Sequence, residues 1–172
     1  MKVVAVSILV LLLATLPANA GAGIELPASI VSWLDAHVAS MRTANGQQMP
    51  RLELPQFVEG QIGGKPAGLL RYTLEGVRGG TDYLEYVAVF WKVSGNFKFC
   101  CTKQVGGKGL NSIEKVSFLG NGLVLTGMQF VPGKDAMCCP SRPFQSTLVV
   151  QDGELIEVGP PSNKSLERTR DR

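Results

Sequence analysis

The chain has 172 residues, 45% of them hydrophobic and 18% charged, which suits one globular domain with a real core and is too short to argue for two. Once Lys2 and the charged residues of 162–172 are set aside, 12 basic and 12 acidic residues remain between positions 21 and 161. A neutral body with a small basic tail gives no electrostatic footprint for nucleic acid, whose binding depends on clustered positive charge.

The first twenty residues have the three parts of a secretory signal. Lys2 precedes an apolar stretch over 3–16, and the small residues Ala18 and Ala20 mark a cleavage site. The apolar stretch is shorter than the ~20 residues that a membrane-spanning helix needs. We therefore expect cleavage after Ala20 and a periplasmic or secreted mature protein without a membrane span.

The first element predicted after the signal is a helix over about 28–42. Its apolar side chains recur at the three- and four-residue spacing of one helix face: Ile30, Trp33, Leu34, His37, Val38 and Met41. Pro27 stands at the start, where proline is tolerated, and Asn45-Gly46 is typical of a helix C-cap. Residues 43–66 are rich in proline and glycine, which predicts an irregular connection with room for one short strand.

From residue 67 onward the pattern is that of strands joined by short turns. Asn121-Gly122 and Asp152-Gly153 are strong hairpin signals, because both central residues of the favoured turn need a positive φ. Seven strands are predicted, over 67–77, 82–93, 97–104, 112–119, 122–131, 145–151 and 154–158. The chain therefore predicts an α+β fold: a curved antiparallel β-meander of about seven strands with one N-terminal helix packed on it.

Two of these strands indicate what covers the sheet. Leu70, Tyr72 and Leu74 alternate with polar residues, which predicts one buried and one solvent-facing side. Residues 86–93 are nearly all apolar, as in a strand covered on both faces, and the helix is the expected cover.

The last residues, 160–172, are polar and charged and contain one large apolar side chain, Leu166. Such a segment cannot bury enough surface to offset the entropy lost on ordering it. The sequence thus predicts a signal peptide over 1–20, a single domain over 21–159 and a disordered tail over 160–172.

Four cysteines stand in two adjacent pairs, Cys100-Cys101 and Cys138-Cys139. In an exported protein such cysteines form disulfides by default, and three connectivities are open. We expect at least one bridge between the pairs, since closing ~40 residues of chain contributes roughly 4 kcal/mol and a bridge between neighbours almost nothing. Adjacent strand residues point to opposite faces, so such a bridge needs a bulge or a strand end near Cys100-Cys101.

Two other uses of the cysteines compete with a structural disulfide. Paired thiolates suit soft copper(I), and an active redox pair is a further alternative. The Cys-x-x-Cys motif at a helix N-terminus, which lowers a thiol pKa in redox proteins, does not occur.

Recognisable catalytic motifs are missing. The single histidine, His37, falls on the apolar helix face, where a packing role is more common than a catalytic or metal-binding one. No serine lies in a Gly-x-Ser-x-Gly motif. Glu75 and Glu85 could form a carboxylate pair on neighbouring strands, but they fit better as outward-facing strand residues. The sequence therefore assigns no catalytic residue, no metal ligand and no cofactor.

A glycine-rich segment, Gly106-Gly107-Lys108-Gly109, separates two predicted strands. It lacks the Gly-x4-Gly-Lys-Ser/Thr spacing of a phosphate-binding loop. Backbone without side chains lets another surface approach closely. Gly106, Gly107, Lys108 and Gly109 are therefore a candidate partner-binding loop.

The segment Asp135-Ala136-Met137-Cys138-Cys139-Pro140-Ser141, with the hairpin that follows it, resembles the C-terminal part of small exported bacterial proteins of uncharacterised function, the LppP/LprE-like envelope proteins. The resemblance covers about the last third of the chain and rests on the Cys-Cys-Pro motif. Gly21 stands where a lipoprotein would carry its lipidated cysteine, and Cys100-Cys101 lies outside the pattern. The resemblance implies a bacterial envelope location and supplies no activity, substrate or catalytic residue.

Three classes of function remain. The favoured one is an exported, non-catalytic envelope protein, a binding or inhibitor-type module for a protein or small-molecule partner. The second is a thiol-redox or copper-handling protein that uses the paired cysteines. The third is an enzyme with an unrecognised carboxylate site.

Overall fold

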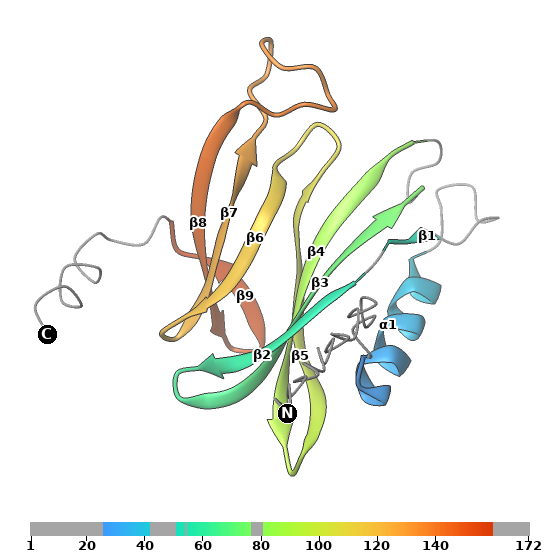
Figure 1. Cartoon of the computed structure of the whole chain (residues 1–172), viewed down its shortest axis with the longest axis vertical. Helices are drawn as coiled ribbons and strands as arrows, with labels where there is room; N and C mark the ends of the chain where they lie inside the picture. The colour runs from blue at the N-terminus through green and yellow to red at the C-terminus, as the bar shows by residue number, and fades with distance from the viewer. Residues whose placement is uncertain (1–25, 42–50, 54, 77–80, 160–172) are drawn as a thin grey trace, which may run out of the picture.

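The computed structural model describes residues 26–41, 51–53, 55–76 and 81–159 (Figure 1). The predicted signal peptide, the Asn45-Gly46 cap and the tail over 160–172 lie outside these residues. Within them the chain forms one helix and nine strands, and every strand pair is antiparallel. The predicted α+β fold with a β-meander is confirmed, and the meander divides into two sheets.

The helix and the two sheets follow one another along the chain. The helix is α1 (Ala28–Ser40). The first sheet comprises β1 (Arg51–Leu52), β2 (Gln56–Ile62), β3 (Lys65–Glu75), β4 (Tyr83–Val93) and β5 (Asn96–Gly107), with β1 and β2 both paired to β3. The second sheet comprises β6 (Ser112–Leu119), β7 (Gly122–Gln129), β8 (Arg142–Gln151) and β9 (Glu154–Glu157), in that order.

The segment 43–66 is predicted to be an irregular connection with room for one short strand, but it contains the seven-residue strand β2. This strand pairs with β3 along all seven of its residues. Gly63 and Gly64 form the turn between them, at φ values of 58° and 76°, which glycine adopts without steric cost. A Gly-Gly pair between two strand-like runs is a hairpin signal. Gly63-Gly64 is therefore the feature of the sequence from which β2 could have been predicted.

The first sheet is the middle layer of three. Helix α1 lies on one of its faces, where the buried Ile30, Leu34 and Val38 pack against side chains of β3, β4 and β5. The second sheet covers the other face, and the two sheets share a second apolar core. Figure 1 shows the same order, with the helix and the second sheet on opposite sides of β3, β4 and β5. The helix face predicted from periodicity is the face that is buried.

Strand β4 is covered on both faces, as the sequence predicts. Tyr86, Ala88 and Phe90 point toward the helix, and Val87 and Val89 belong to the core between the sheets. The helix is therefore the cover for one face only, and the second sheet covers the other.

The prediction that one side of β3, the first long strand, faces solvent is wrong. That side faces the second sheet: Ala67 and Leu69 are buried there, and Arg71 is half-buried. Alternation of apolar and polar residues could not reveal this, because Arg71 is a charged residue with a partner inside the protein.

His37 has the packing role that its position predicts. Its ring stacks on Trp33, with centroids 4.8 Å apart, and lies edge-on to Tyr72 and Tyr86. Burial lowers the pKa of His37, since the apolar surroundings disfavour the charged imidazolium. Among the described residues, no helix has the length and apolar character that crossing a membrane would require.

Candidate functional site

The two sheets are joined most closely at one end. Strand β2 lies against β6, and β5 lies against β9. The turns β2–β3 and β6–β7 meet at this end, where the N–H of Gly63 donates to the carbonyl oxygen of Gly120 at 2.9 Å. Toward the other end, which carries the β5–β6 and β7–β8 loops, the sheets diverge (Figure 1).

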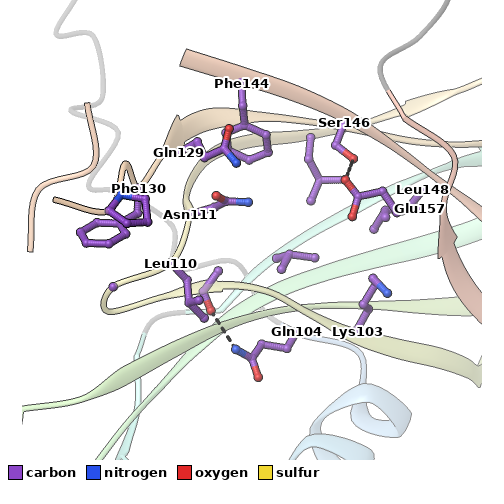
Figure 2. Close-up of a pocket in the computed structure, with 15 residues that line it drawn as sticks. Lys103, Gln104, Leu110, Asn111, Gln129, Phe130, Phe144, Ser146, Leu148 and Glu157 are labelled. Atoms are coloured by element: carbon purple, nitrogen blue, oxygen red, sulfur yellow. Dashed lines mark hydrogen bonds between the residues drawn. The ribbon is translucent and has the colours of Figure 1, made fainter. Parts of the chain in front are cut away.

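A cavity of about 420 Å³ lies between the sheets. Strand β5 contributes Lys103, Gln104 and Val105, and β8 contributes Phe144, Ser146 and Leu148. Gly106 of β5, Leu125 and Gln129 of β7, Glu157 of β9 and residues of the β5–β6 and β7–β8 loops complete the lining. Figure 2 shows these side chains converging from both sheets. The volume falls within the ~300–1,000 Å³ usual for small-molecule sites.

Part of the predicted partner-binding loop borders this cavity. Gly106 and Gly109 line it, whereas Gly107 and Lys108 do not. Lys108 instead reaches back, donating to the Thr81 hydroxyl at 2.8 Å and lying 3.5 Å from the carboxylate of Asp82. At Gly106 a Cβ atom would meet the Asn111 carbonyl oxygen and a carboxylate oxygen of Glu85. The glycine is thus required by close packing inside the protein.

The β7–β8 loop, residues 130–141, lies at the same end of the molecule as the β5–β6 loop (Figure 1), and Asp135 crosslinks it through hydrogen bonds. One carboxylate oxygen of Asp135 accepts hydrogen bonds from the N–H groups of Val131 and Ser141, and the other accepts the Ser141 hydroxyl at 2.6 Å. These bonds lower the pKa of Asp135. The N–H of Gly109 donates to the carbonyl oxygen of Met137 at 2.9 Å and joins the two loops.

An ion pair ties the sheets together beside the glycine-rich loop. Glu85 is buried, and its carboxylate lies 3.0 Å from the Arg71 guanidinium and accepts the N–H of Ile113 at 2.9 Å. Arg71 also donates to the carbonyl oxygens of Ile113 and Glu114, at the start of β6. We call this group the Arg71–Glu85 clasp.

The clasp corrects the prediction that Glu85 faces outward. Glu85 stands opposite Thr73 and Glu75 stands opposite Tyr83, so the two carboxylates lie on neighbouring strands as expected. The carboxylate of Glu85 is occupied by Arg71 and Ile113. It is therefore a structural group, and the two glutamates do not form an acid-base pair.

The two cysteine pairs lie apart, which corrects the expected bridge between them. Cys138 and Cys139 are exposed in the β7–β8 loop and are bonded to each other, while Cys100 and Cys101 are free thiols on β5. Five strand residues lie between Cys101 and Gly107, so the two positions are roughly 20 Å apart along the extended chain. The β7–β8 loop contacts the chain beyond that point, at Gly109. A disulfide needs its Cα atoms about 4–7 Å apart.

A β-bulge explains how neighbouring thiols share one side of β5. Val89 pairs with Cys101 and Phe90 pairs with Phe99, so Cys100 is the extra residue. The bulge brings the two sulfur atoms to 3.3 Å, against the core between the sheets. Burial and the adjacent Cys100 raise the pKa of the Cys101 thiol well above its ordinary value. A thiol that resists ionisation is a poor nucleophile and a poor metal ligand.

Peptide mapping without reduction is therefore expected to give two unlinked cysteine peptides. Cleavage at Lys103, Lys108, Lys115 and Lys134 separates the pairs. The Cys138-Cys139 peptide should carry an internal bridge, and the Cys100-Cys101 peptide should carry two thiols that react with iodoacetamide after unfolding. A crosslinked pair of peptides would contradict the arrangement of β5 and the β7–β8 loop.

The cavity is thus the site in which side chains from distant parts of the sequence converge. Within the part of the chain that the structure describes, no three His, Cys, Asp or Glu side chains gather where they could hold a metal ion. Searches for a matching family model, a similar curated protein and a similar solved structure found no match. Any function must therefore be argued from the cavity itself.

Proposed function

We propose that this chain is an exported, non-catalytic bacterial envelope protein that binds a small amphipathic molecule in the cavity between its two sheets. The observation that carries the proposal is the mixed lining of the cavity. Leu125, Phe144 and Leu148 supply apolar surface, and the amides of Asn111 and Gln129 supply hydrogen-bonding groups. Small-molecule sites typically combine a mostly apolar wall with a few placed polar groups.

The proposal on location rests on the signal pattern over 1–20 and on the resemblance around Cys138-Cys139. The two alternative functions have less support. Thiol chemistry would require ionisation of Cys101, which burial opposes. The carboxylate pair that the sequence offers, Glu75 with Glu85, would require a free Glu85, whose carboxylate is held by Arg71 and Ile113.

Dye binding with a cavity-filling variant tests the proposal. The probe is the neutral dye N-phenyl-1-naphthylamine, whose fluorescence rises in apolar surroundings. Gln129 lines the cavity and is half-buried, so Gln129→Trp should fill the space without overpacking the core. The control is Gln151→Trp, an exposed position outside the cavity. We expect wild type and Gln151→Trp to bind the dye alike, and Gln129→Trp to bind at least about tenfold more weakly, ~1.4 kcal/mol.

Thermal melts should show that both variants remain folded. Absence of dye binding to the wild type, or equal binding to wild type and Gln129→Trp, would overturn the proposal.

A further inference from the structure

The two charged residues that line the cavity come from different sheets. Among the described lining residues these are Lys103 of β5 and Glu157 of β9. Figure 2 shows both at the same end of the cavity, beside Leu148 and Ser146. They carry opposite charges, yet the structure has no ion pair between them.

Neither charge is neutralised by the protein. Lys103 is half-buried, and its ammonium group has no hydrogen-bond or ion-pair partner among the described residues. Glu157 is exposed to solvent on its outer side. Its carboxylate accepts a hydrogen bond from the hydroxyl of the buried Ser146 at 2.5 Å, and this bond orients the carboxylate without cancelling its charge. The cavity therefore offers one cation and one anion, held by two edge strands.

The rest of the lining is uncharged. Leu110, Phe130 and Phe144 gather with the amides of Asn111 and Gln129 at the other end in Figure 2. A ligand that lies along the cavity would thus meet charge at one end and aromatic and aliphatic surface at the other.

Charge balance then selects the ligand. A bound molecule displaces water from the half-buried Lys103 and from the side of the exposed Glu157 that lines the cavity. A charge that loses water without gaining a partner is destabilising. A simple carboxylate would pair with Lys103 but would bring a like charge toward Glu157. An amine would have the opposite defect. A neutral apolar molecule can lie at the uncharged end, but one that reached the charged end would leave both groups unpaired.

We infer that the cavity takes a zwitterionic amphipath: a molecule with a free ammonium and a free carboxylate at one end and a large apolar group at the other. Apolar α-amino acids and short apolar peptides with free ends share this chemistry. The carboxylate would pair with Lys103 and the ammonium with Glu157, while the apolar group would lie against Phe130 and Phe144. This inference rests on the proposed function, because it names the ligand class of the same cavity.

The experiment compares capped and uncapped ligands by calorimetry on the full exported chain. The probes are phenylalanine and the dipeptide Leu-Phe, each with free ends, with an N-acetyl cap and as the C-terminal amide. We expect each cap to weaken binding to the wild type by about tenfold, equivalent to ~1.4 kcal/mol. Comparison of phenylalanine with Leu-Phe shows whether the cavity prefers a single apolar amino acid or a short apolar peptide.

Two variants assign the charges. In Lys103→Met the C-terminal amide cap should no longer weaken binding, and in Glu157→Gln the N-acetyl cap should no longer do so, because the partner of the capped group has been removed. Lys98→Met and Glu154→Gln are the matched controls, since both residues are exposed on the same strands and lie outside the cavity. These controls should behave as wild type.

The outcomes separate this inference from the proposed function. Equal binding of capped and free ligands to the wild type, or no binding of either, would overturn the zwitterionic ligand. If the neutral dye still binds and Gln129→Trp still weakens it, the cavity remains a binding site for another class of molecule. If the dye also fails to bind, the proposed function fails as well.

Discussion

Replacing Glu85 with alanine is expected to lower the free energy of unfolding by about 3–5 kcal/mol. The glutamate side chain is 7% exposed and its partner Arg71 is 20% exposed. Removal of the carboxylate leaves the guanidinium without its counter-ion and the N–H of Ile113 without its acceptor. Urea denaturation at neutral pH measures the effect.

An exposed ion pair provides the control for this prediction. Lys92 lies 2.5 Å from Glu59, and their side chains are 35% and 52% exposed. Glu59→Ala should cost no more than about 1 kcal/mol, because solvent screens such pairs. The double variant Arg71→Met with Glu85→Ala should be more stable than the two separate losses predict, since no unpaired charge remains. If Glu85→Ala costs no more than Glu59→Ala, the clasp does not hold the sheets together.

The second large effect is expected at the helix. Leu34 is 3% exposed and packs against the first sheet, so Leu34→Ala should remove about 2–5 kcal/mol of unfolding free energy. Its neighbour Val31 is 40% exposed, and Val31→Ala should change stability by no more than about 0.5 kcal/mol. Equal effects of the two substitutions, measured by thermal and urea unfolding, would mean that α1 is not a packed layer of the fold.

Local patterns in the sequence predict much of this fold. The spacing from Ile30 to Met41 identifies the buried helix face, because helix periodicity follows from backbone geometry alone. Asp152 and Gly153 form the last turn, at φ values of 51° and 81°, as their residue types predict. These features depend on neighbours in the chain, so a single sequence contains the evidence for them.

The features that the sequence does not reveal all depend on distant residues. The β5–β6 loop connects β5, an edge strand of the first sheet, to β6, an edge strand of the second. Only residues 108–111 form this loop, so its length does not distinguish it from a turn between two strands of one sheet. The half-buried state of Arg71 follows from Glu85 and from the start of β6. Likewise Lys103 and Glu157 share the cavity only because β5 lies against β9.

The bulge at Cys100 is a further case. A register shift of one residue decides whether two adjacent thiols lie on the same side of β5. Nothing in the run from Phe99 to Thr102 signals that shift, because bulges arise from the pairing of two strands and not from one strand alone.

The order of the strands separates the local steps of folding from the long-range step. Within the second sheet each strand pairs with the next one along the chain, and in the first sheet the pairing of β1 with β3 is the sole departure within the described residues. Each sheet can therefore form from local contacts, and docking of one sheet on the other is the long-range step. A ligand that contacts Lys103 and Glu157 at once would bridge the docked halves, so it should act as a removable crosslink whose contribution to stability grows with its concentration.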